Sequence, residues 1–520
     1  MSRRHSDGGP IISRRRVLIG VAAGSGTTLL PSIVRAAIEP RKGGTLHLAM
    51  PYNPASIDPM TGRNLPDFNV LYAIYDALID FDPDTLQLKP GLASAWRFEN
   101  ATALVLDLVD GAQFHDGTPF NPEAAKFNLD RYKSDPRSNV KADLNALANV
   151  EITGKNQITL HLARPNAGLP AILTNRVGLM VSPTSVKTKG PDVNRIGVGT
   201  GPFKFLEWQD NDRFALVKNG GYWRSGLPYL DGISMSIVNE LNTAVRTVMS
   251  GETDLALNMQ VPQKLIADRS NNVVTETGPS LVFGNIAMNY SRGPLSDVRV
   301  RQAINYGLDR DELNKVLAAG LGEPTCAVLP KEHWACDPST IHYYKHDPDR
   351  ARALLKEAGY PNGIDLAAFG WPDQMSMQRQ ELITTELEKS GIRIKLTPTT
   401  PQQAMQRVMI EKRGDMLMGP TGGFPDPSQF YEALLAKDAL RNPGKIEIPG
   451  FRPLMDATEA TSDMPTRKVA FARLQRFVIE QALQAPQYIW PTVNVMSSRL
   501  RNFRGGIIGT PKFQEVWLAA

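Results

Sequence analysis

Helix and strand patterns alternate along this chain from Gly43 to its end, and this alternation constrains the fold more than any other feature. The stretch GGTLHLAM (43–50) alternates apolar and polar residues, as a half-buried strand does. The stretch RQELITTELEKSGIRIKLTPT (379–399) has helical spacing first and a strand pattern afterwards. EITGKNQITLHLA (151–163) predicts a hairpin, and other hairpins fall in the first half. Together these patterns predict a mixed α/β fold.

The length of the chain sets how this α/β structure is divided. Its 520 residues are 42% hydrophobic and 21% charged, which is ordinary for globular proteins. A single core does not grow to this size, so we expect roughly two to four structural lobes. No low-complexity linker and no internal repeat separates them. The lobes are therefore predicted to be built from discontinuous segments.

Two helices carry clear start signals. NPEAAKFNLDRY predicts a helix capped by Asn121 with Pro122 in its first turn. DPDRARALLKEAGY predicts a second helix, with Asp347 as its cap, Pro348 next and Gly359 at its exit.

The first residues are predicted to be an export signal. Three arginines, Arg14 to Arg16, precede an uncharged run from Val17 to Val34, as in a cleavable signal peptide over residues 1–36. The Ser-Arg-Arg pattern resembles a twin-arginine signal and is favoured over an ordinary Sec signal. No cysteine follows the run, so no lipid anchor is expected. These features predict a soluble periplasmic protein.

The signal also explains the apparent basic charge. Residues 1–36 hold six arginines and one acid, Asp7, out of totals of 58 basic and 53 acidic residues. Their removal leaves 52 of each, so the mature chain has no net charge. The sequence pI of 9.0 therefore gives no reason to expect nucleic acid or an anionic membrane as partner.

The only cysteines are Cys326 and Cys336. In an exported protein a disulfide closing this short loop is the favoured interpretation. A free thiol pair and a metal site with the nearby His333, His342 and His346 remain alternatives. Because the spacing of zinc ligands is missing, no metal ligand is predicted.

Familiar catalytic patterns are missing from the sequence. It contains no Gly-x-Ser-x-Gly elbow and no His-Glu-x-x-His motif. FHDG (114–117) fits a turn after a strand, and GVGTGPF (197–203) lacks the following helix that a phosphate cradle needs. A binding protein is therefore favoured over an enzyme, and no cofactor is expected.

The stretch GPTGGFPDPSQF (419–430) is rich in glycine and proline around Phe424. Glycine relaxes the backbone and proline removes a donor, so we predict a shaped loop with neither helix nor regular strand. Such loops often carry function.

Four stretches in this order resemble one protein family. They are LASAWRF…FHDGTPFNPEAAKFNLDR (92–131), VGTGPFKFLEW…VKNGGYW (198–223), DVRVRQAINYGLDRDEL (297–313) and DPDRARALLKEAGYPNG (347–363). Together they are similar to the solute-binding proteins of ABC importers that take oligopeptides, dipeptides, nickel and opines. The resemblance implies a two-lobed periplasmic-binding-protein fold of class II, cluster C type. It also implies a monomer that closes on a small solute and meets an inner-membrane permease with its ATPase.

The resemblance further implies lobe boundaries. Lobe I would comprise 43–78, 195–290 and 485–520, an extra subdomain 79–194, and lobe II 291–484. Candidate ligand-binding residues follow from it too. They are Asn53, Ser56, Asn289, Tyr290, Trp371, Asp373, Gly423, Phe424 and Asp426.

The chain departs from the peptide binders at two of these places. Gly423 falls where those proteins resemble one another in holding an acid for the peptide ammonium. Gly370 falls where dipeptide binders have a basic residue. A peptide-like or opine-like solute or a sugar conjugate is therefore favoured over a free dipeptide. Trp371 as a core residue and Asp426 as a turn residue remain open, as do a metal-chelate solute and an exported hydrolase.

Overall fold

The structure is a computed structural model that describes residues 39–62, 65–437, 439 and 441–520. Residues Arg41–Ala520 form one compact unit. The predicted signal peptide lies outside the described residues. In the part that is described, no helix has the length and apolar character needed to cross a membrane.

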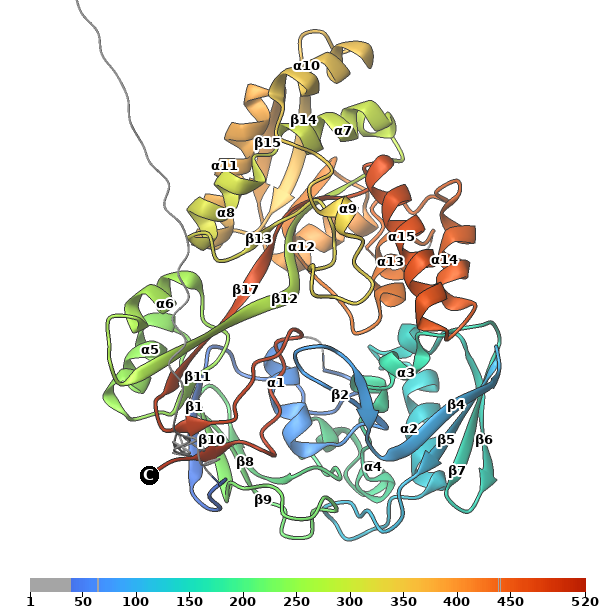
Figure 1. Cartoon of the computed structure of the whole chain (residues 1–520), viewed down its shortest axis with the longest axis vertical. Coiled ribbons are helices and arrows are strands. Elements are labelled where there is room, and N and C mark those ends of the chain that lie inside the picture. The colour runs from blue at the N-terminus through green and yellow to red at the C-terminus, as the bar shows by residue number, and fades with distance from the viewer. Residues whose placement is uncertain (1–38, 63–64, 438, 440) are drawn as a thin grey trace, which may run out of the picture. The chain divides into compact units, whose positions relative to one another are not determined.

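The largest element is an eleven-stranded mixed sheet (Figure 1). Its strands are paired in the order that follows, with β13 (Glu323–Pro324) joined to β17 off the main path. The order is β15 (Ile392–Pro398), β14 (Ile364–Gly370), β16 (Met416–Gly422), β12 (Val273–Met288), β17 (Ala485–Ser497), β11 (Leu255–Ala256), β1 (Thr45–Met50), β10 (Gly232–Ile237), β9 (Arg213–Lys218) and β8 (Phe203–Gln209). The predicted mixed α/β organisation is confirmed.

Strands β12 and β17 are the longest in the sheet, and they run side by side in Figure 1 between two separately packed parts. Their antiparallel pairing is regular from Val273 to Pro279, which lies opposite Pro491. The register then shifts before Phe283 pairs with Ile489. Proline has no backbone N–H to donate, so two facing prolines weaken the ladder at this point.

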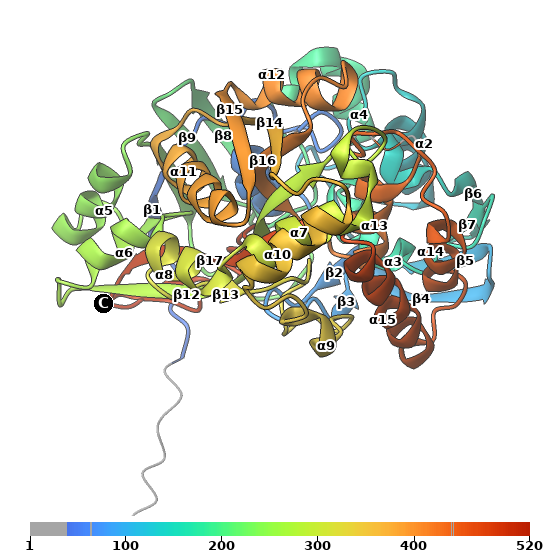
Figure 2. The ribbon, with the colours of Figure 1, turned by 90° about the horizontal axis from the view of Figure 1, so that it is seen from above.

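One end of the sheet is covered on both faces. The buried side chains of Leu366, Ala368 and Met418 pack with α11 (Gln374–Lys389) in a large core. On the other face, Phe369 and Leu417 pack with the π-helix η5 (Gln406–Ile410) beyond α12 (Pro401–Met405). Figure 2 shows α11 and α12 on opposite sides of β14.

Further helices complete this large core, which runs from Val261 to Ile489. They are α7 (Val298–Gly307), α8 (Arg310–Ala318), α9 (Pro338–Ile341), α10 (Pro348–Glu357), α13 (Pro427–Leu435), α14 (Phe451–Glu459) and α15 (Met464–Glu480). Aspartate side chains cap most of them, as they do at favourable helix starts. The predicted cap at Asp347 is confirmed, since its carboxylate accepts from Arg350 N at 2.8 Å.

A second core surrounds the opposite end of the sheet. It draws on residues from Leu46 to Leu86, from Phe203 to Leu281 and from Leu500 to Val516. Its elements include α1 (Leu65–Ile74) and the pair β18 (Leu500–Arg501) and β19 (Trp517–Leu518). Nearby, α5 (Leu241–Ser250) and α6 (Val261–Ala267) pack with β17 in a smaller cluster.

A third core belongs to residues 60–180. Its four-stranded sheet has the order β4 (Ala93–Asn100), β5 (Ala103–Leu108), β7 (Gln157–Leu162) and β6 (Leu147–Gly154). The hairpin β6–β7 is the one predicted from the sequence. Helix α2 (Pro122–Ser134) contacts this sheet, and its predicted Asn121 cap is confirmed by a 2.9 Å bond from Ala124 N. Smaller elements are β2 (Ile79–Phe81), β3 (Leu88–Pro90), α3 (Leu169–Ile172) and α4 (Pro183–Lys189).

The glycines of GVGTGPF have a packing role. A Cβ on Gly199 would lie 2.2 Å from the Ile74 carbonyl oxygen, and one on Gly201 would lie 2.5 Å from the Ile74 carbonyl carbon. Only glycine lets this segment approach the end of α1 so closely.

We therefore expect Gly201→Ala to lower the free energy of unfolding by about 1–3 kcal/mol, because backbone atoms of Ile74 and Tyr75 cannot yield to the methyl group. Urea unfolding of the purified protein measures this. Gly220→Ala is the control, since nothing lies within 4 Å of its Cβ position, and it should change stability by less than about 0.5 kcal/mol. Equal midpoints for the two variants would contradict the close approach.

Candidate functional site

The predicted loop at 419–430 is shorter than expected. Residues Gly419 to Gly422 complete strand β16, and α13 begins at Pro427, so only 423–426 form the loop. The prediction of a loop throughout is wrong for two reasons. The strand tolerates Pro420 where it pairs with Gly284, and Pro427 occupies the first helical turn, where a missing N–H costs nothing.

Gly423 is held closely against β12. Its amide donates to the Leu281 carbonyl at 2.7 Å. A Cβ on Gly423 would lie 2.9 Å from Leu281 Cβ, whereas a Cβ on Gly422 would meet nothing within 4 Å. There is therefore space for a new side chain at Gly422, the last residue of β16, and none at Gly423 in the loop.

The Asp426 carboxylate is hydrogen-bonded to other groups of the protein. It accepts from Ser428 N at 3.0 Å and caps α13. Both carboxylate oxygens also lie 3.0 Å from Arg467 Nη2, in an ion pair whose side chains are almost fully buried. These bonds fit the turn and capping role that the sequence left open.

Phe424 packs against the large core and is only partly buried. The guanidinium carbon of Arg441 lies 5.9 Å from the centre of its ring. Burial lowers the pKa of Arg441, and within the described residues this side chain has no hydrogen bond or ion pair. The loop thus offers an aromatic face with an uncommitted cation over it.

Trp371 and Asp373 lie between β14 and α11. The Trp371 ring packs against the backbone of Gly419, where a Cβ would lie 3.6 Å from ring atom Cε2. Asp373 is exposed and caps α11 through Ser376 N at 3.0 Å. Trp371 thereby lies beside the 419–430 segment, as the resemblance implies.

A group that sequence reasoning missed lies beside these residues on the α11 face of the sheet. We call Arg379, Gln380, Gln487 and Trp490 the Arg379 cluster. Arg379 is 4% exposed, and its guanidinium carbon lies 5.3 Å from the centre of the Trp490 ring. No sequence signal distinguished these residues, because they come from a helix and a strand about 110 positions apart.

The remaining predicted residues are engaged in local structure. Asn53 Oδ1 accepts from Trp208 Nε1 at 3.1 Å, and Ser56 Oγ lies 2.7 Å from Thr61 Oγ1. Asn289 and Tyr290 follow β12 and are buried beside the large core, where Arg301 lies over the Tyr290 ring. None of the contacts described for these four residues involves the loop at 423–426.

Three contacts join the third core to α13 and α14. Arg164 pairs with Glu459, and Ala167 N donates to the Glu459 carbonyl at 3.0 Å. Gln429 Nε2 donates to Asp143 Oδ1 at 3.1 Å. Burial raises the pKa of Glu459 and of Asp143. Segments distant in sequence are therefore tied together next to the loop.

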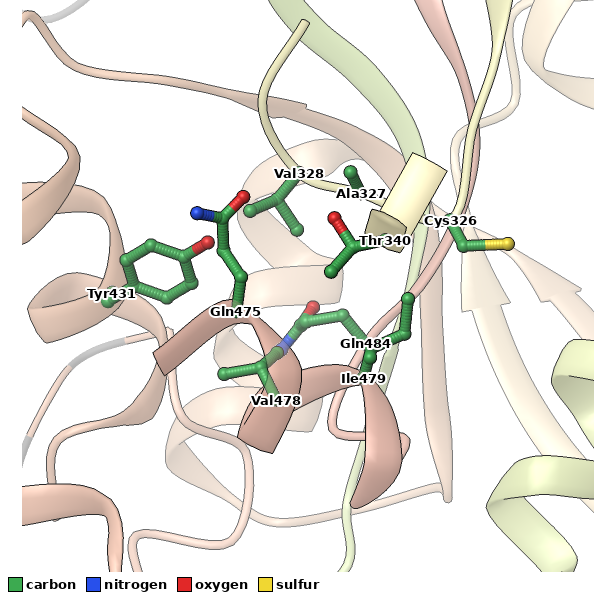
Figure 3. A pocket seen from close by; sticks show the side chains of 9 residues that line it. All are labelled: Cys326, Ala327, Val328, Thr340, Tyr431, Gln475, Val478, Ile479 and Gln484. Atoms are coloured by element: carbon green, nitrogen blue, oxygen red, sulfur yellow. The ribbon is translucent and has the colours of Figure 1, made fainter. Parts of the chain in front are cut away.

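A small cavity is lined by Thr340, Tyr431, Gln475 and other side chains, which Figure 3 shows. Its volume is about 10 Å³, whereas sites for small molecules measure roughly 300–1,000 Å³. It has room for about one water molecule, for which the unpaired Tyr431 hydroxyl is a partner. This cavity is too small to hold a solute.

A family model described as Bacterial extracellular solute-binding proteins, family 5 Middle, matches residues 87–442. This chain belongs to family 5. It is accordingly the solute-binding component of an ABC import system, as the sequence predicted.

Known relatives of this family 5 protein agree with that assignment. The glutathione-binding protein GsiB of Shigella flexneri serotype 5b (strain 8401) is 29% identical over 402 residues, covering 77% of this chain and 76% of GsiB. DppA from Helicobacter pylori in complex with peptide STSA has a TM-score of 0.81 at 22% identity, covering 92% of this chain and 99% of DppA. AgaA from A. tumefaciens R10 in complex with agropinic acid has a TM-score of 0.79 at 22% identity, with the same coverage. The predicted two-lobed fold is confirmed.

The predicted disulfide of this family 5 protein is not formed. Cys326 and Cys336 are both free and buried. Cys326 Sγ contacts the Tyr344 carbonyl at 3.5 Å, while Cys336 Sγ contacts the Leu329 carbonyl at 3.7 Å, so each thiol has a separate partner. Burial raises the pKa of Cys336 to about 12, which keeps it protonated.

The histidines considered as metal ligands also have different partners in the structure. His333 is buried and accepts from Ala335 N. His346 lies between Asp309 and Glu386, at 3.3 Å and 3.7 Å. In the described ranges, that trio is the one group spaced to hold an ion, and it includes neither cysteine.

From the buried Asp426–Arg467 ion pair we predict a loss of stability when its charge balance is removed. Asp426→Asn leaves a buried guanidinium without its counter-charge and should lower the free energy of unfolding by about 3–5 kcal/mol. Asp373→Asn is the control, because asparagine caps an exposed helix start about as well as aspartate does. Guanidinium unfolding compares the two. If Asp426→Asn kept full stability but lost solute binding, Asp426 would be a ligand residue instead.

Proposed function

We propose that this protein captures a carboxylate-bearing, peptide-like or opine-like solute in the periplasm, with glutathione as the first candidate. The lobes would be 43–78, 195–290 and 485–520 for lobe I, 79–194 for its subdomain and 291–484 for lobe II. In this proposal the solute binds between them and the closed protein delivers it to an inner-membrane permease. Export would depend on the signal at 1–36.

The observation that carries the proposal is the balance of free charges at the loop. Its only acid, Asp426, is bonded to Arg467 and to the start of α13. The nearby cation Arg441 has no acid among its described contacts and lies over Phe424. A peptide ammonium would find no partner on this loop, whereas a carboxylate would find one.

The relatives support the same class of solute. The name of GsiB gives glutathione, a tripeptide with two carboxylates, and the structure of AgaA contains agropinic acid. Glutathione joins its first residue through the side-chain carboxyl, so its ammonium lies away from the first peptide bond. An acid at the Gly423 position is then not required.

A solute panel tests this function. Glutathione, agropinic acid, the dipeptide Met-Leu and Ni(L-His) are each added to the processed protein while its unfolding is followed. A bound solute at 100 times its dissociation constant adds about 2.7 kcal/mol of stability. We expect glutathione and agropinic acid to give the largest increase in stability. If Met-Leu gives the largest increase in stability, or if neither glutathione nor agropinic acid gives any, the proposal is contradicted.

The open space at Gly422 allows a test of the missing acid. Gly422→Asp places a carboxylate next to the loop without a clash and should strengthen Met-Leu binding by roughly tenfold or more, through a charge-assisted contact with its ammonium. Calorimetric titration measures the change. Gly422→Asn is the matched uncharged control and should give no gain. An equal gain for both variants would show that charge is not responsible.

A further inference from the structure

Arg379 occupies an unusual position for a charged residue. The residues that helix α11 buries are Ser376, Arg379, Gln380, Glu386, Ile383 and Leu387. The last two pack in the large core. The buried stripe of this helix thus begins with three polar residues next to Trp371 and continues with two apolar residues and Glu386.

The Arg379 guanidinium has no counter-charge in contact with it. Its Nη2 is buried without a hydrogen bond, and no ion pair to this side chain occurs within the described residues. Burial lowers its pKa, and the nearest aspartate acting on it, Asp373, is exposed at the helix start. A buried charge without a partner is unfavourable, so its retention requires an explanation.

Three more polar atoms of the Arg379 cluster are buried without partners. They are Gln380 Oε1, Gln487 Oε1 and Trp490 Nε1. Two glycines leave the space that these side chains occupy. A Cβ on Gly284 would lie 2.4 Å from Gln487 Oε1 and 3.4 Å from Trp490 Nε1, and one on Gly370 would lie 2.2 Å from Gln380 Oε1.

The unpaired atoms form a complementary set. Arg379 and Trp490 supply donors, while the two glutamines supply acceptors. A guanidinium suits the planar carboxylate, to which it can donate two parallel bonds. The amide N–H beside a peptide carboxylate is a suitable donor to a glutamine oxygen.

We propose that the Arg379 cluster is a subsite for a carboxylate of the solute, with Arg379 and Trp490 as donors to it. This inference rests on the proposed function and assigns the solute a second anchoring point besides the loop at 423–426. Because Gly284 and Trp490 belong to β12 and β17 next to their register shift, a carboxylate here would contact the strands that link the two cores.

The test compares glutathione with its diethyl ester, in which both carboxylates are blocked. Wild-type protein, Arg379→Met and Arg379→Lys are titrated with both compounds by calorimetry. Arg379→Met should weaken glutathione binding by roughly 100-fold, and Arg379→Lys by less. The ester, with both carboxylates blocked, should bind wild-type protein at least as weakly as glutathione binds Arg379→Met, and Arg379→Met should weaken it little further.

Arg407→Met is the matched control. Arg407 also lies over an aromatic ring, at 5.5 Å from the centre of Phe369, but on the α12 side of the sheet. It should leave glutathione binding unchanged. Without solute, Arg379→Met should unfold at the same temperature as wild type or higher, because it removes an unpaired buried charge.

Three outcomes are decisive against the subsite. If wild-type protein binds glutathione and Arg379→Met binds it equally well, the inference fails while the proposed function stands. If wild-type protein binds neither glutathione nor agropinic acid, the proposed function fails and the inference with it. If Arg379→Met weakens binding of the ester as much as binding of glutathione, Arg379 maintains the shape of the site and does not bind a carboxylate.

Discussion

The pairing of β12 with β17 is the interaction on which the rest of this structure depends. These two strands carry the sheet from the core around Leu46–Val516 to the core around Val261–Ile489. Where they pass between the cores, Pro279 faces Pro491 and the register shifts. Missing N–H donors make this the weakest part of the ladder, and therefore the part where we expect one core to rotate relative to the other.

Around this junction, charges divide into those that the protein has paired and those that it has not. Asp426 and Arg467 neutralise each other, and Asp373 caps a helix. Arg379 and Arg441 have only aromatic partners among the described contacts. The unpaired charges are cationic. In the proposed function, a local excess of this kind selects an anionic solute, and closure around it excludes the water that would otherwise solvate these groups.

The sequence allowed prediction of features that depend on neighbours in the chain. The caps at Asn121 and Asp347 need only the following turn, and both were correct. Features that depend on distant partners were missed or wrong. The disulfide failed because each thiol finds a different carbonyl. The strand at Gly419–Gly422 was missed because β12 stabilises it. The Arg379 cluster could not be foreseen, since the contact of Arg379 with Trp490 exists only after α11 packs on the sheet.

The central claim is that the solute presents a carboxylate to the Arg379 cluster at the junction of the two strands. A crystal structure of the protein with glutathione tests it most directly. The account predicts a carboxylate oxygen within about 3 Å of Arg379 Nη2, with the second oxygen near Trp490 Nε1. Glutathione bound elsewhere, with both of these atoms still unpaired, would contradict it.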